Sequence, residues 1–387
     1  MKRKILSAVL VLVGFGCQSA PFGRDAQLPH SAPVWPEPRH RVEVPPAPSE
    51  DASGIIGDPI VGFTETGRVV VFDGQNGNVL STATGGGGTP RDIAVDRWRK
   101  GVWVFEENDD ASGGEVRFCP LENAFGASNM DNVQLQPCAH AVWIDGLAAM
   151  WPTEAGLWIF EYGIGGSRWK ILRSGEATPS VSAPRPASIW LENGEIEALS
   201  FGFQNDRLQV FRGTFGQTGP EVTQKFDWGK PFGYPPMARY ARLGCDAGLL
   251  FDALSNTLTV RRVENGEPGL PMTIDVGMPV SRIEAATGLG TSALVLGKDA
   301  LWIVTTHDAD VELMAGLWLH GDVRESPLFF SRDLLVTPSR AFVGTDRGVR
   351  AIAMENDGPA LVNVYLEEEF VGDELRGPLD ALAPDGS

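Results

Sequence analysis

Histidine and cysteine are scarce in this chain, with five and four copies among 387 residues. No two histidines stand at the spacing of paired zinc ligands. The chain also lacks the Gly-x-Ser-x-Gly elbow of serine hydrolases and the Gly-x-x-x-x-Gly-Lys loop that cradles phosphates. Four consecutive glycines, 85–88, precede a strand pattern instead of a helix, so we interpret them as a flexible connector. The sequence therefore contains no recognisable catalytic motif.

Positive charge is also in short supply. The chain has 32 Lys and Arg against 50 Asp and Glu, a formal net charge of −18. A nucleic-acid binder needs clustered Lys and Arg to release counterions from phosphates, so no nucleic-acid partner is expected. The acidic residues are mostly dispersed, which favours a solvated surface that keeps the protein soluble. Cation binding, with Ca²⁺ as the candidate, is the alternative, although the acidic run 106–110 lacks the ligand order of an EF-hand.

The N-terminus has the layout of a bacterial secretion signal. Three basic residues, 2–4, precede an apolar run from Ile5 to Val13 that is too short to span a bilayer. Small residues and Cys17 follow, and this arrangement resembles a lipoprotein signal. The resemblance implies a signal peptide over residues 1–16 and a lipid anchor on Cys17. Signal-peptidase cleavage after Ala20 is the competing interpretation.

Three nearby residues bear on the cleavage site and on the expected location of the protein. Pro21 disfavours cleavage after Ala20, whereas Gly14 stands where lipoprotein signals usually place Leu. Gln18 is not the aspartate that retains lipoproteins at the inner membrane of enteric bacteria, so the resemblance implies an outer-membrane lipoprotein facing the periplasm or the cell surface. Residues 17–53 are rich in proline and predict a flexible tether between this anchor and the folded domain.

Cys119 and Cys138 flank a polar loop and are the candidate disulfide if the compartment is oxidising. Closing such a loop stabilises a fold by roughly 3 kcal/mol in the chain-entropy model. Cys245, between Gly244 and Asp246, is interpreted as a small buried residue.

A short apolar run recurs along the rest of the chain. Gly101–Phe105 (GVWVF) returns as Gly156–Phe160 (GLWIF), and looser copies begin at Gly248 and Arg340. Each copy is followed by a polar turn and a second run rich in β-branched residues, a pattern that predicts a β-hairpin. Seven such second strands, each followed by a third strand, are centred on Val61, Trp103, Trp158, Leu199, Leu250, Leu294 and Phe342. Their spacing of about 40–55 residues is that of propeller blades.

Two segments of the first blades carry a family resemblance. Val69–Leu80 (VVVFDGQNGNVL) and Thr89–Asp96 (TPRDIAVD) resemble the blade hairpin and inner strand of quinoprotein-type and YVTN-type β-propellers. The resemblance implies an all-β fold, a seven-bladed β-propeller of four-stranded blades over residues 54–371, followed by an acidic tail over residues 372–387. It implies no activity, because propellers host binders, scaffolds and enzymes alike.

The ring of a propeller must close, since an unpaired blade edge promotes aggregation. The first blade begins at its second strand, so its inner strand must come from residues 54–56 or from the C-terminal Glu369–Val371. In the second case the two ends of the chain clasp one another, and deletion from residue 367 onward is expected to destabilise the whole domain.

Inner strands line the channel of a propeller, so their polar ends are candidate sites. Four carboxylates follow predicted inner strands and form a possible channel cation site: Asp96, Asp145, Glu192 and Glu284. Converging oxygens of this kind suit Ca²⁺. The competing interpretation is that each carboxylate accepts backbone N–H groups in the turn that follows.

Tryptophan is the enriched residue, with eleven copies. Those on predicted strands are expected to pack between blades: Trp103, Trp143, Trp158, Trp169, Trp190, Trp302 and Trp318. Trp98 and Trp151 fall near turns and form a possible interaction surface for a protein loop or a glycan.

Two functions follow from these patterns. The first is a membrane-anchored envelope lipoprotein whose propeller acts as a protein-binding or assembly module, with no cofactor and with an envelope protein as partner. The alternative is a propeller-type enzyme, a lactonase-like hydrolase or a quinone-dependent oxidoreductase, that uses the channel carboxylates.

Overall fold

A computed structural model describes most of the chain from residue 59 to residue 381, and the statements below concern those residues. They are 59–64, 67–108, 113–123, 133–145, 147–163, 166–173, 176–177, 181–182, 186–192, 195–202, 207–215, 220–229, 239–243, 247–252, 257–264, 267–276, 280, 282–285, 292–307, 310–319, 321–323, 334–337, 340–357, 360–370 and 376–381. The signal, the tether and Cys245 lie outside this set. Within it the regular structure is all β, and no helix is long and apolar enough to cross a membrane.

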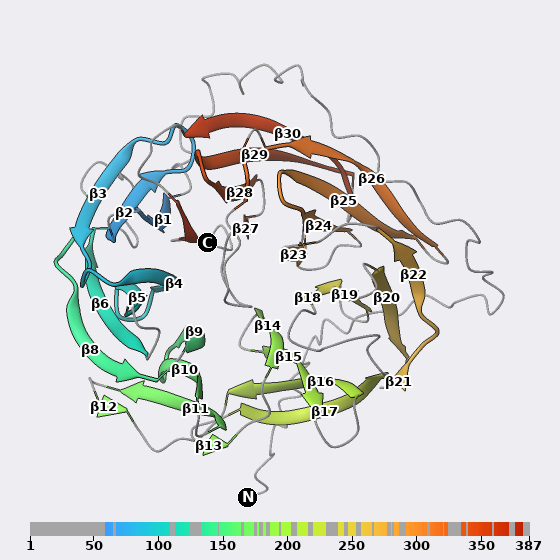
Figure 1. The fold of residues 1–387 in the computed structure, drawn as a ribbon, viewed down its shortest axis with the longest axis horizontal. Helices are drawn as coiled ribbons and strands as arrows, with labels where there is room; N and C mark the ends of the chain where they lie inside the picture. The colour runs from blue at the N-terminus through green and yellow to red at the C-terminus, as the bar shows by residue number, and fades with distance from the viewer. Residues whose placement is uncertain are drawn as a thin grey trace, which may run out of the picture.

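The described strands form seven antiparallel sheets, each of four or five strands, that lie around a common centre (Figure 1). The first four sheets along the chain contain β1 (Pro59–Phe63), β2 (Arg68–Asp73), β3 (Val79–Thr84) and β31 (Arg376–Ala381); β4 (Thr89–Asp96), β5 (Gly101–Glu107), β6 (Gly114–Glu122), β7 (Gln134–Leu135) and β8 (Ala139–Ile144); β9 (Leu147–Thr153), β10 (Gly156–Gly163), β11 (Gly166–Arg173), β12 (Glu176–Ala177) and β13 (Val181–Ser182); and β14 (Pro186–Glu192), β15 (Glu195–Gly202), β16 (Arg207–Phe215) and β17 (Pro220–Gly229).

The remaining three sheets contain β18 (Arg239–Leu243), β19 (Ala247–Asp252), β20 (Thr257–Glu264), β21 (Glu267–Pro268) and β22 (Met272–Asp275); β23 (Arg282–Ala285), β24 (Ser292–Leu296), β25 (Ala300–His307) and β26 (Asp310–Trp318); and β27 (Leu334–Val336), β28 (Arg340–Thr345), β29 (Gly348–Asp357) and β30 (Ala360–Phe370). All seven predicted second strands occupy the second position of their sheets, and the predicted third strands pair with them.

The inner strands are the ones nearest the centre in Figure 1: β31, β4, β9, β14, β18, β23 and β27. Strand order in an antiparallel sheet then defines two faces of this arrangement of sheets. On the turn face, inner strands lead into second strands, as residues 97–100 do between β4 and β5. On the connector face, the outer strand of one sheet leads to the inner strand of the next, as residues 85–88 do between β3 and β4.

The repeated apolar run is explained by burial on both sides of each sheet. In β5, Val102 and Val104 pack toward the sheet of β1 to β3, whereas Trp103 and Phe105 pack toward the sheet of β9 to β13. Because successive side chains of a strand point to opposite faces, a sheet packed on both faces needs apolar residues at every position. The prediction that Trp103 packs between neighbouring sheets is confirmed.

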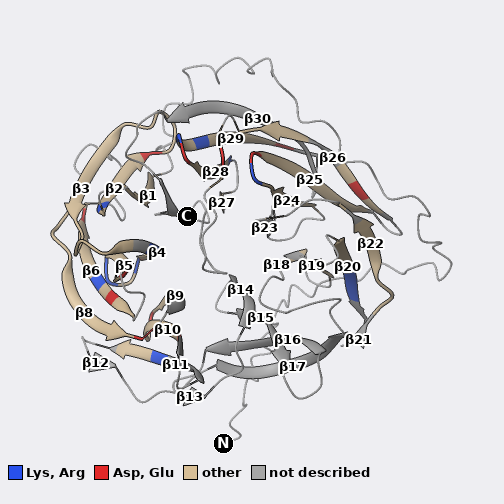
Figure 2. Cartoon of the chain, viewed as in Figure 1, with Lys and Arg blue, Asp and Glu red and all other residues tan. Residues whose placement is uncertain are grey.

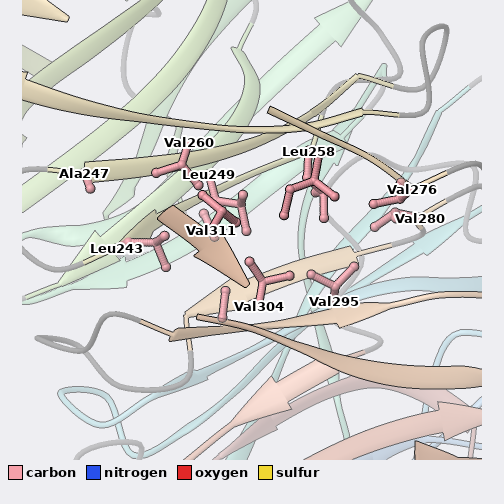
Figure 3. Packing of buried hydrophobic residues seen from close by; sticks show 13 residues of the cluster. Leu243, Ala247, Leu249, Leu258, Val260, Val276, Val280, Val295, Val304 and Val311 are labelled. Atoms are coloured by element: carbon pink, nitrogen blue, oxygen red, sulfur yellow. The ribbon is translucent and has the colours of Figure 1, made fainter. Parts of the chain in front are cut away.

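The same packing holds between the sheet of β18 to β22 and the sheet of β23 to β26. Leu249, Leu258 and Val260 of one sheet meet Val295 and Val304 of the next in a single buried cluster (Figure 3). Burial of branched aliphatic side chains between sheets supplies the main stabilising term of such a fold.

The first sheet is completed by the C-terminus, as one of the two closure alternatives expected, but through different residues. Strand β31 pairs with β1, with Val61 opposite Asp380 and Gly62 opposite Leu379. Glu369 and Phe370 belong instead to β30, which pairs with β29. The predicted boundary at residue 371, with a tail beyond it, is therefore wrong, because residues 376–381 form a strand. The sequence did not indicate this strand, because Pro378 argues against a strand in the interior of a sheet. Proline is accepted here because β31 lies at the edge of its sheet.

A second correction concerns the strand that contains Val142, Trp143 and Ile144. It was predicted as an inner strand, but β8 pairs with β6 on the outer side of its sheet. The inner strand of the next sheet is β9, directly after it. The outer strand of one sheet and the inner strand of the next are consecutive in the chain, and both are apolar. The hydrophobic pattern therefore does not show with which strand each of them pairs.

Candidate functional site

Asp96 ends the inner strand β4 and is completely buried. Its Oδ1 accepts the backbone N–H of Arg99 at 2.9 Å, and its Oδ2 accepts the Arg99 guanidinium and the Trp103 indole N–H, each at 2.8 Å. Both carboxylate oxygens are thus engaged in holding the turn after β4. This is the second of the two sequence interpretations for Asp96, an acceptor for the turn that follows.

The other predicted channel carboxylates do not join Asp96 at a described site. Asp145 is exposed and follows the outer strand β8, so its place at the channel was wrong. Glu192 and Glu284 do lie on inner strands, β14 and β23, but their side chains are outside the described set. Among the side chains that the structure describes, no three His, Cys, Asp or Glu residues gather at metal-binding distance.

The turn between β4 and β5 presents an exposed aromatic side chain. Trp98 is 44% exposed, and the guanidinium of Arg97 lies 4.8 Å from the centre of its ring, which is cation–π geometry. Trp151, the second half of the predicted surface, is only 8% exposed and lies within β9 opposite Trp158. The prediction of an exposed Trp151 was wrong, because the strand continues through it to Thr153.

The turn that carries Trp98 is fixed at several points. Arg99 reaches across to the adjacent sheet, where its guanidinium donates to the carbonyls of Thr153 at 2.9 Å and Glu154 at 3.2 Å. On the other side, the N–H of Leu121 donates to the carbonyl of Lys100 at 2.9 Å. Trp98 therefore stands on a turn that is bound to its own sheet and to the next.

Another tryptophan departs from expectation. Trp143 of β8 was predicted to pack between blades, but it is 44% exposed. It pairs across the strands with Glu115 of β6. Since β8 is the outermost strand of its sheet, fewer neighbouring strands cover its side chains, and Trp143 stays in contact with solvent.

A buried acidic site on the connector face was not predicted. Glu106, expected in an acidic loop, lies near the end of β5 and is almost fully buried. Its Oε2 accepts the N–H of Gly86 at 2.5 Å and lies 3.5 Å from Nε of Arg117. Its Oε1 is buried without a hydrogen-bond partner. Burial of this carboxyl raises its pKa above the ordinary value of 4.5, and the Gly86 N–H and Arg117 oppose that rise.

The four-glycine connector passes directly over this carboxyl. A Cβ on Gly85 would stand 2.0 Å from Oε1 of Glu106 and 2.4 Å from the carbonyl oxygen of Gly67. Glycine is therefore required here for close approach of two backbone segments to a buried side chain. The connector is a packed element of the described structure, and our interpretation of it as merely flexible was incomplete.

The same arrangement returns one sheet later. Glu161 ends the second copy of the repeated strand, is buried, pairs with Lys170 at 2.5 Å and accepts the N–H of Asp145 at 3.1 Å. Arg117 and Lys170 hold the same register, each opposite the residue two positions before its glutamate. The signal was visible as GVWVFE and GLWIFE, but the sequence did not show that the final glutamate turns inward.

Cys119 and Cys138 form a disulfide, with their Cα atoms 4.0 Å apart. It joins β6 to the segment between β7 and β8, on the outer side of the second sheet. Cys119 is fully buried in the cluster that contains Val102 and Val104, so the bond lies against the hydrophobic core.

No protein-family model matches the chain, and no curated protein matches it in sequence. Solved structures resemble it in fold. A functionally unknown protein from Desulfotomaculum acetoxidans has a TM-score of 0.55 and 13% identity over 85% of this chain and 100% of its own. A protein from Lactobacillus plantarum has a TM-score of 0.54 and 14% identity over 82% and 98%. Apo AztD from Citrobacter koseri matches more weakly, with a TM-score of 0.47 and 9% identity over 84% and 98%. At these identities the likeness establishes the fold alone, which is all-β and propeller-like.

Proposed function

We propose that this chain is an envelope lipoprotein, anchored through an acylated Cys17, whose propeller binds another envelope protein on its turn face. In this proposal the seven sheets are the blades of one closed ring, and residues 17–53 hold that ring away from the outer membrane. The pairing of β31 with β1 supports closure, since it joins the two ends of the described chain in one sheet.

The observation that carries the binding role is Trp98. An exposed tryptophan on a turn with two fixed sides loses little freedom when a partner covers it, and tryptophan and arginine are enriched among the residues that dominate binding energies. The turn directly follows the inner strand β4, so a partner that covered it would lie on the turn face, next to the strands nearest the centre in Figure 1.

The enzymatic alternative has less support. It relied on four carboxylates converging at the channel, but Asp96 is bound to Arg99 and Trp103, and Asp145 follows the outer strand β8 instead of an inner strand. Asp96 and Asp145 were two of the four candidate ligands. Because a cation site needs several oxygens at once, their loss weakens the proposed channel site.

The experiment is crosslinking in intact cells of the native host, followed by purification of the tagged full chain and identification of crosslinked proteins. A reproducible partner that is lost with Trp98→Ala and retained with Trp143→Ala supports the proposal. The two residues are equally exposed, so Trp143→Ala controls for removal of a surface tryptophan. Recovery of the same proteins with both variants would count against binding at the turn face.

Anchoring is tested separately by feeding cells a fatty acid with a clickable tag. Label is expected on the wild-type chain and absent from Cys17→Ser. Equal labelling of both chains, or none on either, would contradict acylation at Cys17.

A further inference from the structure

The turn between β4 and β5 is unusual for this chain in its charge. Residues 97–100 read Arg-Trp-Arg-Lys, three cations around one tryptophan, although acidic residues outnumber basic ones by 50 to 32 overall. Arg97, Trp98 and Lys100 are exposed, and these Lys and Arg positions are among the blue segments in Figure 2. A local cationic patch on an acidic protein attracts anionic groups to one place.

Arg99 contributes to this patch indirectly. Its guanidinium is bound to Asp96 and to two carbonyls of the adjacent sheet, so it fixes the turn on which Arg97 and Lys100 are exposed. A binding group that is already fixed loses less conformational entropy when a ligand arrives. The turn is therefore preorganised by one of its own cations.

Lys100 carries its positive charge at a position where the backbone conformation disfavours lysine. Its φ of 53° is in the left-handed region, which residues other than glycine seldom adopt. Glycine or asparagine would adopt this conformation with less backbone strain. The chain has lysine at this position, which suggests that the charge serves a purpose other than turn formation.

We propose that residues 97–100 bind an acidic segment of the partner protein, with Trp98 as the central contact and Arg97 and Lys100 pairing with carboxylates on either side. This rests on the proposed function and names the chemistry of its partner. Arg and Lys beside an aromatic side chain combine charge-assisted hydrogen bonds with buried apolar area.

A narrow ligand fits the surroundings better than a flat anionic surface does. Glu122 and Glu154 are exposed and stand close to the turn, since Leu121 bonds to Lys100 and the carbonyl of Glu154 bonds to Arg99. A membrane of anionic lipid would have to approach both glutamates together with the cations. An acidic peptide segment can contact the cations and avoid the glutamates, so like-charge repulsion is smaller.

The test measures binding of a fluorescein-labelled ten-residue peptide of alternating Glu and Ser to the purified full chain carrying Cys17→Ser, by fluorescence anisotropy. The Lys–Ser peptide of the same length is the control for charge, and vesicles of phosphatidylglycerol are the competing anionic probe. Binding of the acidic peptide is expected to weaken as salt is raised, because exposed charges are screened.

Two turn variants are compared with two matched controls. Trp98→Ala and the double variant Arg97→Glu/Lys100→Glu are expected to weaken binding of the acidic peptide by about tenfold or more. Trp143→Ala, at an equally exposed tryptophan, and Arg347→Glu, at an exposed arginine on the connector face, are expected to leave it within about twofold. Circular dichroism confirms that each variant is folded.

The outcomes separate this inference from the proposed function. Equal weakening by turn and control variants, no effect of the turn variants, or a preference for vesicles over the acidic peptide would each overturn the inference. If the cellular partner is still captured by the turn variants, the binding function stands and its assignment to this turn fails. If no partner is captured but peptide binding depends on the turn, the acidic specificity stands and the envelope partnership fails.

Discussion

The indole N–H of Trp103 donates a 2.8 Å hydrogen bond to the carboxylate of Asp96, seven residues earlier in the chain. Both residues are buried, and the same carboxylate binds Arg99, whose guanidinium reaches the next sheet. One carboxylate therefore links an inner strand, a second strand and a neighbouring sheet.

Asp96→Ala is expected to lower the free energy of unfolding by about 2–4 kcal/mol, because the Trp103 N–H is left buried without an acceptor and Arg99 loses its carboxylate. Urea denaturation monitored by tryptophan fluorescence measures the change. Trp103→Phe, which removes the donor and keeps a large aromatic ring, is the milder comparison. A loss below about 0.5 kcal/mol for Asp96→Ala would show that this network contributes little to stability.

Glu106→Gln tests the buried carboxyl beneath the glycine connector. Its pKa is raised in the folded protein because burial disfavours the charge, so the folded state holds the proton more tightly than the unfolded chain does. The stability that this proton provides is complete below the ordinary pKa of 4.5 and is lost as the pH rises through the raised value.

We therefore expect Glu106→Gln to gain stability relative to wild type as the pH is raised from 4 to 8. Glutamine keeps an oxygen that can accept the Gly86 N–H but carries no charge. Melting temperatures of both chains across this range provide the measurement, with Glu154→Gln, at an exposed glutamate, as the control for changing the net charge by one. A difference between Glu106→Gln and wild type that is independent of pH would contradict the raised pKa.

Leu379→Ala tests closure of the first sheet by the C-terminus. Leu379 is completely buried in a cluster with Ile60, Phe72 and Phe342, so it contacts its own sheet and the preceding one. Truncating a buried leucine costs about 2–5 kcal/mol. The melting temperature is expected to fall sharply, and a chain ending at residue 375 is expected to be less stable still.

Deletion from residue 367 onward is still expected to destabilise the domain, because it removes the strand that pairs with β1. Residues 376–381 carry the closure, so a chain ending at residue 381 is expected to melt like the full chain. A chain ending at 375 that melts at the full-length temperature would show that β31 is dispensable.

Removing the disulfide by the double change Cys119→Ser/Cys138→Ser is expected to lower the free energy of unfolding by roughly 3 kcal/mol. Part of this loss comes from placing a hydroxyl at the buried position 119, so Cys119→Ala/Cys138→Ser is the matched comparison. Reducing agent is expected to destabilise wild type and to have no effect on either variant. Equal sensitivity of all three chains to reductant would contradict a stabilising bond.

Local pattern was enough to predict the second and third strands of every sheet. The repeat that begins at Gly101 and returns at Gly156 identified the second strands, because sheets buried on both faces require uninterrupted apolar runs that local composition displays. The sequence also offered the C-terminus as one of two sources of the missing inner strand. A first sheet that lacks its inner strand must obtain that strand from an end of the chain.

Pairing and side-chain direction were decided only by the tertiary structure. The sequence could not tell that Val142–Ile144 pairs outward, that Glu106 and Glu161 turn into the interior, or that residues 376–381 complete the first sheet. Hydrophobic period reports which segments are buried, whereas the choice of neighbour depends on contacts between residues far apart in the chain. Trp98 and Trp151 show the difference most directly: both follow inner-strand patterns near turns, but only Trp98 lies beyond the end of its strand, so only Trp98 remains exposed for a partner.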